Sequence, residues 1–237
     1  NVSVLNGESS GMNTSNLVTS TLTRQVPYNS YSLNFDSGNP DNIACGTSTS
    51  IASASSYSIS TWVKINTAGG VIFSSGTSNT DRTFLFIGAS SVSFGVKTGS
   101  GGVISWTNSF TSVWHHVVGV VDSGTSYLYV DGVQKATGSV STLSATAGNN
   151  VKIGDTTSPM TASPFDGQIN NVSIFDIPLT STEVMKLYNS GVPGNLSNFN
   201  PNPTAWWSLG SDSYYNGSNW ICPDLVGSNN GTSANMD

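Results

Sequence analysis

Side chains that could support catalysis are scarce in this chain. Glutamate occurs only twice in 237 residues, at Glu8 and Glu183, and neither has another acidic residue within two positions. Acid–base cleavage of a glycosidic bond needs two carboxylates held close together. His115 and His116 are adjacent in a strand-like run, so they point to opposite faces and cannot chelate one ion together. No serine–histidine–aspartate order is visible either, and the sequence therefore predicts a protein that is not an enzyme.

Charge and composition exclude two classes of partner. Lys and Arg number 7 against 13 Asp and Glu, giving a net charge of −6 and a pI near 4.5. Such a surface has little to attract nucleic acid or an anionic membrane. Apolar runs such as 117–121 are much shorter than the roughly 18–20 residues of a spanning helix. Ser, Thr, Asn and Gly make up about half of the chain, which favours an extracellular, cell-surface or virion location.

Short alternating runs predict β-strands along most of the chain. They are rich in β-branched and aromatic residues and are separated by Gly, Ser, Asn and Asp. The Asp131-Gly132 pair predicts a type I′ hairpin turn, because both positions of that turn need positive φ. The predicted strands are 31–35, 57–65, 71–74, 83–87, 92–97, 103–106, 114–122, 127–130, 133–136, 151–153 and 168–175.

One helix is predicted, near residues 180–190. Thr180 and Glu183 have the spacing of a capping box, Val184 and Leu187 recur at helical spacing, and Gly191 is placed to stop the helix. Many short strands and one short helix predict an all-β protein folded as a two-sheet antiparallel sandwich.

Four segments in order resemble the laminin-G-like, concanavalin A-like jelly rolls found in phage and environmental surface proteins. These segments are YSLNFDSGNPDNIACG, YSISTWVK, WHHVVGVVDSGTSYLYVDGVQ and FDGQINNVSIFDIPLTSTEVMKLYNSG, and the resemblance covers residues 31–189. The resemblance implies a jelly-roll sandwich.

The resemblance also shows an element out of its usual place. Such domains usually open with a W-W-x-L-G strand, but here Trp206, Trp207 and Leu209 stand near the C-terminus, followed by the usual D-x-x-G stretch at 224–232. The order of the elements therefore looks circularly shifted, with the usual first strands of the domain at the end of this sequence. Without these strands the sandwich would expose an apolar groove and open edges. The tail must therefore complete either its own sandwich or that of the next copy, in a head-to-tail assembly.

This reasoning predicts four parts of the chain and a first function. The parts are a polar N-terminal segment packed on the sandwich or a neighbour (1–30), the jelly roll (31–191), a linker (192–204) and the completing strand segment (205–237). The predicted function is a non-enzymatic structural protomer or repeat unit of an extracellular filament or virion. The alternative is a glycan-binding, lectin-like module. A glycoside hydrolase is the third reading, which the missing carboxylate pair disfavours.

The resemblance implies a calcium site that this chain matches only in part. Asp36 and Asp41 stand where relatives place carboxylate ligands of Ca²⁺. A proline lies between them, and the later acidic stretch is replaced by uncharged residues, with Asn170 as the remaining ligand. No cofactor is required in this reading, although Ca²⁺ is possible. The alternative is a pair of ordinary turn aspartates.

Other sites stay open at the level of sequence. The resemblance puts Cys45 and Cys222 near the same strands, so they could form a disulfide or remain buried thiols. Six glycosylation sequons are about what chance predicts, and they mark possible sites only at Asn1, Asn13, Asn171, Asn195, Asn216 and Asn230. Three tryptophans are expected in the core and three in loop-rich contexts, where sugar stacking competes with ordinary packing. The two groups are Trp62, Trp114 and Trp207, and Trp106, Trp206 and Trp220.

Overall fold

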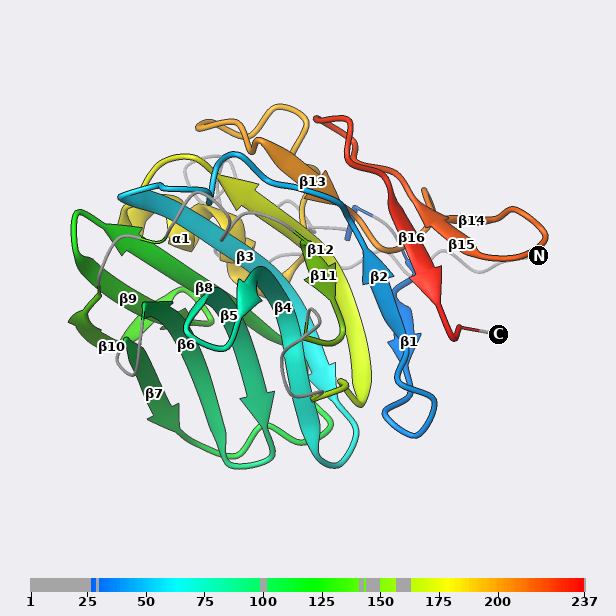
Figure 1. Cartoon of the computed structure of the whole chain (residues 1–237), viewed down its shortest axis with the longest axis horizontal. Helices are drawn as coiled ribbons and strands as arrows, with labels where there is room; N and C mark the ends of the chain where they lie inside the picture. The colour runs from blue at the N-terminus through cyan, green and yellow to red at the C-terminus, as the bar shows by residue number, and fades with distance from the viewer. Residues whose placement is uncertain are drawn as a thin grey trace, which may run out of the picture.

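Two antiparallel sheets pack face to face in the computed structural model, which describes residues 27–28, 30–98, 102–140, 143, 150–156 and 163–236 (Figure 1). The first sheet has the order β1 (Leu33–Phe35), β12 (Gly167–Phe175), β3 (Ser56–Ile65), β8 (His115–Asp122), β9 (Thr125–Val130) and β10 (Val133–Ser139), and β13 (Ala205–Trp207) also pairs with β12. The second sheet has the order β14 (Tyr214–Tyr215), β15 (Trp220–Cys222), β16 (Gly231–Ala234), β2 (Asn42–Ala44), β11 (Lys152–Ile153), β4 (Gly69–Ser78), β5 (Asp81–Gly88), β6 (Ser91–Thr98) and β7 (Val103–Thr107). The predicted all-β sandwich is confirmed.

The local signals of the hairpin and the helix are confirmed in detail. Asp131 and Gly132 both have positive φ, 52° and 78°, as a type I′ turn requires. The helix α1 (Ser181–Tyr188) begins at a complete capping box, in which Thr180 accepts from the Glu183 N–H and the Glu183 carboxylate accepts from the Thr180 N–H. The helix ends at Asn189, a left-handed residue, and a 3₁₀ turn, Asn189–Gly191, follows.

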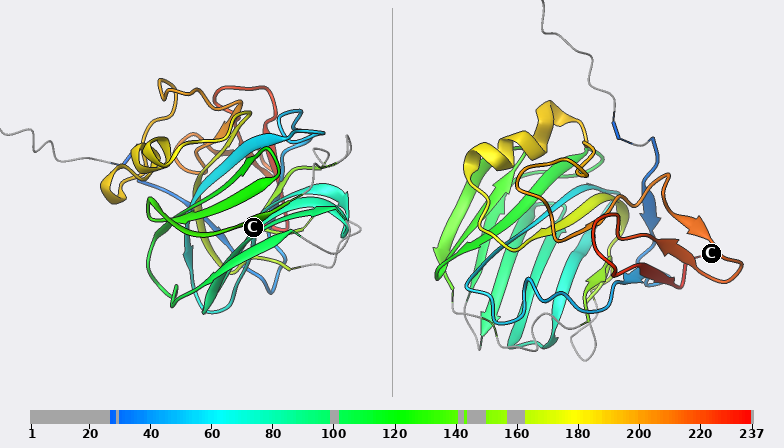
Figure 2. Two further views of the ribbon diagram at one scale, coloured as in Figure 1. Left: turned by 90° about the vertical axis from the view of Figure 1, so that its left-hand side faces the viewer. Right: turned by 90° about the horizontal axis from the view of Figure 1, so that it is seen from above.

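Strand alternation sorts the residues of the first sheet into two layers. On β3, Tyr57, Ile59 and Val63 enter the main core between the sheets, so the intervening Trp62 lies on the outer face. A smaller apolar cluster covers part of that outer face, where Val184 and Leu187 of α1 pack with strand residues such as Val118. Figure 2 shows α1 lying across the first sheet. The helix thus covers one part of the outer face and leaves another part accessible for a site.

One edge of β12 is divided between the head and the tail of the chain. β3 pairs along one side of β12, while β1 pairs with residues 167–169 and β13 with residues 172–174 on the other. A bulge between Asn170 and Ser173 marks the junction, with Asn171 at φ 56°. The Asn171 side chain donates to the Gly194 carbonyl at 2.9 Å and accepts from the Trp206 indole, so it joins β12, the linker and the tail.

The tail pairs within its own chain in this structure. Trp206 is buried in the outer cluster and Trp207 and Leu209 in the main core, and β16 pairs with β2 of the second sheet. In Figure 1, β2 and β16 run side by side at one end of the molecule. Within this single chain the tail closes its own sandwich, which is one of the two arrangements that the sequence leaves open.

Little of the predicted N-terminal segment, residues 1–30, falls within the described part. Residues 1–26 and 29 lie outside it. Tyr28 packs against Trp206, with ring centroids 5.2 Å apart, and its N–H donates to the Pro193 carbonyl at 2.9 Å. The last residues of the segment therefore rest on the tail and the linker.

The two cysteines are free thiols, and both are buried. Gly231 of β16 pairs with Cys222 on one side, and the register of β16 with β2 places Cys45 on the other. Two strand spacings separate the cysteine Cα atoms by roughly 10 Å, whereas a disulfide needs less than about 7 Å. Of the two alternatives that the sequence leaves open, the structure shows two buried thiols. Burial raises the pKa of Cys45, and burial also raises the pKa of Cys222 to about 11, so both stay protonated near neutral pH.

The buried carboxylate of Asp224 fastens the tail. It accepts the N–H groups of Trp206 (2.9 Å), Val226 (3.4 Å), Gly227 (2.9 Å) and Asn229 (3.1 Å). Bonds to an ionised acceptor are stronger than those between neutral groups. This one side chain therefore fixes the turn that brings β13 and β16 into different sheets.

We expect Asp224→Ala to lower the free energy of unfolding by about 3 kcal/mol, because it leaves several buried N–H groups without an acceptor. Urea unfolding followed by tryptophan fluorescence measures the loss. The matched control is Asp122→Ala at an exposed strand end, which should change stability by less than about 0.5 kcal/mol. Equal effects of the two substitutions would contradict the role given to Asp224.

Candidate functional site

A pocket of about 550 Å³ opens on the outer face of the first sheet, and we call it the sheet-face pocket. Its aromatic and amide lining comes from Trp62, Trp114, Gln168 and Asn170. Its remaining walls are the chain entering β1 and the turn after α1, namely Pro27, Ser30, Tyr31, Ser32, Gly191 and Pro193. Its size lies within the roughly 300–1,000 Å³ range of small-molecule sites.

Of the two tryptophans that line the sheet-face pocket, Trp62 is fixed by aromatic rings that pack against it. Trp62 is buried and stacks on Tyr188 of α1, with ring centroids 5.8 Å apart and an angle of 17° between the planes. On the neighbouring strand, His116 lies 5.1 Å from the Trp62 ring. The second tryptophan, Trp114, is only half-buried. The pocket thus combines a fixed ring with an accessible one.

The two amides come from one strand. Gln168 and Asn170 are two residues apart on β12, so they share a face. The Asn170 side chain donates to the Tyr31 carbonyl at 2.8 Å, which fixes the wall in front of it. Gln168 is half-buried, and its amide offers both a donor and an acceptor.

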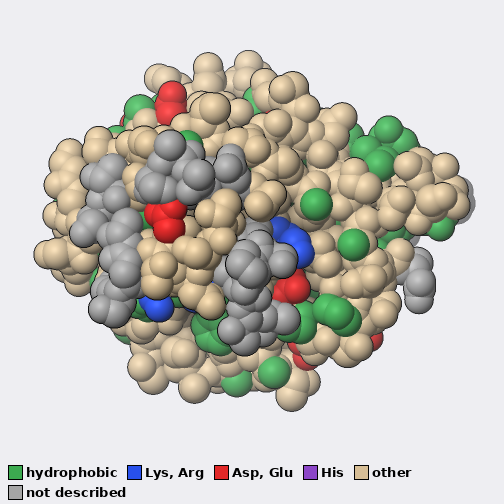
Figure 3. Space-filling view, in the orientation of Figure 1, with side chains coloured by type: hydrophobic (Ala, Val, Ile, Leu, Met, Phe, Trp, Pro, Cys, Tyr) green, Lys and Arg blue, Asp and Glu red, His purple; other side chains and the backbone are tan. Residues whose placement is uncertain are grey.

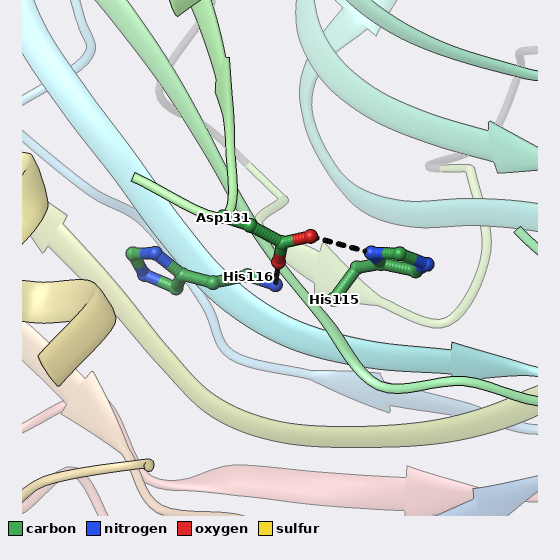
Figure 4. Close-up of polar contacts among 3 residues, drawn as sticks. All are labelled: His115, His116 and Asp131. Carbon is green, nitrogen blue, oxygen red and sulfur yellow. Dashed lines mark hydrogen bonds and ion pairs between the residues drawn. The ribbon is translucent and has the colours of Figure 1, made fainter. Parts of the chain in front are cut away.

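The histidine pair divides between the two faces, as the sequence predicts (Figure 4). His115 packs edge-on against Phe110 of the core and shares a hydrogen bond of 2.8 Å with the Asp131 carboxylate. That carboxylate also accepts the backbone N–H of His116 at 2.9 Å. Although burial opposes it, these hydrogen bonds lower the pKa of Asp131. Asp131 therefore ties the hairpin turn to the start of β8.

His116 is a buried neutral imidazole behind Trp62. Its Nε2 lies 2.8 Å from the Ser60 hydroxyl, and Tyr188 stacks over it with centroids 6.2 Å apart. Burial lowers the pKa of His116 from 6.5 to about 3, only partly opposed by the charge of Asp131. The ring acts as a packing element of the pocket floor rather than as a proton carrier near neutral pH.

A second pocket, of about 640 Å³, lies along the outer edge of β1, and we call it the edge pocket. One side is formed by residues 31–34 with Asp36, Asn39 and Asp41. The opposite side is formed by the tail, with residues 210, 211 and 213, Trp220, Asn235 and Met236. It exists only because the tail returns beside the head of the chain.

The structure does not bring the three predicted calcium ligands together. Asp36 and Asp41 share one loop, where the Asp36 N–H donates to Asp41 at 2.8 Å and the Gly38 N–H donates to Asp36 at 2.8 Å. Asn170 lies in the sheet-face pocket, about four strand positions from the level of Asp36, or roughly 13 Å. The two aspartates make the turn bonds that the sequence offered as the alternative. Within the described ranges, no three His, Cys, Asp or Glu side chains gather closely enough to hold a metal ion.

The sequons fall into three groups. Asn171 is buried and hydrogen-bonded through both amide atoms, so the folded chain cannot offer it for glycosylation. Asn195, Asn216 and Asn230 are exposed and stay possible sites. Asn1 and Asn13 lie outside the described residues.

The tryptophan assignments need two corrections. Trp206, expected in a loop-rich context open to sugar stacking, is fully buried, because β13 places it under α1 and the linker. Trp114, expected in the core, lines the sheet-face pocket. Its position could have been found from strand phase, since it is two residues before His116 and shares the outer face, whereas Val117 enters the core.

The sequence pattern of the concanavalin A-like lectin/glucanases superfamily matches residues 36–185. This chain belongs to that superfamily. The matched range runs from the turn after β1 into α1 and leaves out the tail that completes both sheets. No curated protein matches the chain.

Solved structures share the fold at low sequence identity. A candidate carbohydrate-binding protein from Bacteroides ovatus has a TM-score of 0.65 and 16% identity, and the match covers 88% of this chain but 58% of that protein. A heptameric SAP-like pentraxin from Limulus polyphemus has a TM-score of 0.52 and 17% identity over 78% of this chain and 85% of its own. The CBM40 domain of the Ruminococcus gnavus IT-sialidase, bound to α2,3-sialyllactose, has a TM-score of 0.50 and 18% identity over 67% and 96%.

In the part of the chain that the structure describes, no helix has the length and hydropathy of a transmembrane span.

The buried His116 predicts a loss of stability in mild acid. The unfolded chain takes up a proton near pH 6.5, whereas the folded chain resists it until about pH 3. Stability from this group is therefore complete above pH 6.5 and falls as the pH drops toward 3. Between pH 7 and 5 the loss is about 2 kcal/mol. Urea unfolding at a series of pH values measures it.

His116→Gln should flatten this dependence between pH 7 and 5, whatever its effect on absolute stability. The matched control, His115→Gln, removes the adjacent histidine and should keep the dependence. An unchanged slope in His116→Gln would show that the group behind Trp62 does not titrate as described.

Proposed function

We propose that this chain is a carbohydrate-binding module without catalytic activity. The observation that carries the proposal is the lining of the sheet-face pocket, where tryptophan rings and side-chain amides stand together on one rigid sheet face. A pyranose ring presents an apolar C–H face and a rim of hydroxyl groups. Aromatic rings match the first, and amides, which both donate and accept, match the second.

The rigidity of the pocket favours binding of a small polar ligand. Trp62 is held by Tyr188 and His116, and Asn170 is held by the Tyr31 carbonyl. A preformed site loses less conformational entropy on binding than a mobile one. Among the tryptophans and amides of the lining, the half-buried Trp114 and Gln168 are more open to a ligand than the buried Trp62 and Asn170.

The fold relatives support this reading as analogy. The Bacteroides ovatus protein is a candidate carbohydrate binder, and the Ruminococcus gnavus domain is bound to a sialylated sugar. At 16% and 18% identity they support a fold that accommodates glycans, and they do not fix which glycan this chain binds.

This proposal reverses the order that the sequence favoured. The assembly role depended on a tail that lacked a place in its own sandwich, yet β13 and β16 pair within the chain. A role in a filament or virion has no further support here and stays a prediction. An extracellular location is part of the proposal, because free glycans and a surface poor in charge fit that setting. Figure 3 shows few charged side chains on the face seen in Figure 1.

The placement of the carboxylates supports a module without catalytic activity. Glu183 caps α1, and its carboxylate accepts hydrogen bonds from the backbone N–H and the hydroxyl of Thr180. Asp36 and Asp41 accept backbone hydrogen bonds within their own turn. Among the described residues lining the sheet-face pocket there is no carboxylate. Hydrolysis of a glycosidic bond there would lack both the acid and the nucleophile.

We expect the folded chain to bind glycans on an array and Trp114→Ala to weaken that binding at least tenfold, about 1.4 kcal/mol. Trp106→Ala is the matched control, since Trp106 is also half-buried but lies on β7, away from the pocket. Thermal melting confirms that each variant is folded. A folded wild-type chain that binds no glycan would remove the proposal.

Glycan binding should not depend on calcium. The paired aspartates are engaged in their own turn, and Asn170 is engaged with Tyr31. Affinities measured in about 1 mM CaCl₂ and in about 5 mM EDTA should agree within twofold. Both concentrations are in large excess over the protein. Loss of binding in EDTA would contradict this expectation and show that a cation is required.

A further inference from the structure

Two side chains line both pockets. Tyr31 and Ser32 belong to the wall of the sheet-face pocket and to the wall of the edge pocket. The two hollows therefore meet at the residues that lead into β1. A ligand that leaves one hollow over Tyr31 enters the other.

Tyr31 is placed to contact such a ligand. Its side chain is 70% exposed, the highest fraction among the large exposed hydrophobic residues that the structure describes. Its backbone is fixed, because its carbonyl accepts from the Asn170 side chain. A large aromatic ring on a fixed backbone between two hollows is a suitable surface for stacking a sugar.

The edge pocket has the same kind of lining as the sheet-face pocket. Trp220 is half-buried, and its ring packs against Tyr215 with centroids 6.0 Å apart. The Trp220 N–H donates to the Ser233 hydroxyl at 2.8 Å, which fixes its backbone. Asn39 and Asn235 add amides, with Asn39 donating to the Asn235 carbonyl across the pocket. Figure 3 shows hydrophobic side chains gathered at the end of the molecule that carries β14 to β16.

The backbone of β1 adds to this surface. β1 pairs with β12 on one side and is the outermost strand of its sheet on the other, facing the edge pocket. An edge strand turns alternate N–H and C=O groups outward, and these match the hydroxyl groups of a sugar as well as side-chain amides do.

Charge limits the chemistry of the ligand. Asp36 and Asp41 line the edge pocket, and among the described residues lining either pocket there is no Lys or Arg. The cation nearest by strand register is Lys64, opposite Gln168 at the sheet-face end. An acidic sugar in the edge pocket would meet carboxylates with no cation to compensate them.

We propose that the two pockets form one continuous groove that binds a neutral oligosaccharide of several sugar units, with Tyr31 as the central stacking surface. This inference rests on the proposed function and adds the size and charge of the ligand. One end of the oligosaccharide lies against Trp114, and its other end lies against Trp220. The tail of the polypeptide thus contributes one side of the binding site.

The test is calorimetric titration with cello-, xylo-, manno- and β-1,3-gluco-oligosaccharides of one to six units. For the series that binds, affinity should rise at least tenfold from two units to five and then level off. Trp220→Ala should remove this gain and leave disaccharide affinity within twofold, whereas Trp114→Ala should weaken every length. Tyr31→Ala, a substitution at an exposed side chain that should not disturb folding, should also lower the affinity for long oligosaccharides to nearly that for a disaccharide.

The matched control is Tyr214→Ala, on the same hairpin but paired with Ile221 and absent from the pocket lining, which should change no affinity. Equal affinity for two and five units in the wild-type chain would overturn the groove but keep a single sugar site. No binding in any series, with the chain folded, would overturn the proposed function as well. Sialyllactose or an oligogalacturonide bound as tightly as a neutral trisaccharide would overturn the charge argument.

Discussion

Each residue of β12 can pair with only one strand along each edge, and the structure depends on how the second edge is divided between β1 and β13. β1 from the head of the chain occupies residues 167–169, and β13 from the tail occupies residues 172–174. Asn171 stands at the junction in a left-handed conformation that Asn tolerates better than most residues. Its N–H donates to the Ser208 carbonyl at 2.9 Å, and its side chain reaches the linker and Trp206. Head and tail are thereby fixed beside one another.

This arrangement creates the surface to which we assign function. Because the tail returns beside β1, the entry to β1 has the sheet-face pocket on one side and the edge pocket on the other. Asp224 holds the tail turn that supplies the second wall. The groove therefore depends on the stability of the folded tail, since loss of the tail would remove Trp220 and Asn235 from the site.

Much of the fold could be predicted from local patterns. Alternation identified the long strands, Asp131-Gly132 identified the hairpin, and the Thr180–Glu183 spacing identified the helix start, because each depends on a few adjacent residues. The short strands β2, β14 and β15 carry only two or three residues each, too few to show alternation, and β2 also depends on partners far along the chain, β11 and β16. Which sandwich the tail completes is likewise a matter of tertiary pairing, and no local pattern decides it.

The candidate site was harder to predict for the same reason. The sequence alone predicts the wrong environments for Trp114 and Trp206, because the local pattern around a tryptophan in a strand is the same whether or not a helix covers it. Tyr31 appeared only as the start of a strand, and its position between two pockets follows from contacts with residues more than a hundred positions away. The aspartate pair was recognised by spacing, but its distance from Asn170 follows from the register of β1 on β12.

The most direct test of this account is the indole N–H spectrum of the folded chain during titration with the neutral oligosaccharide that binds best. The account predicts that the signals of Trp114 and Trp220 shift together with one affinity, while those of the buried Trp206 and Trp207 stay unchanged. Saturation of a folded chain by a pentasaccharide that leaves both Trp114 and Trp220 unmoved would contradict it.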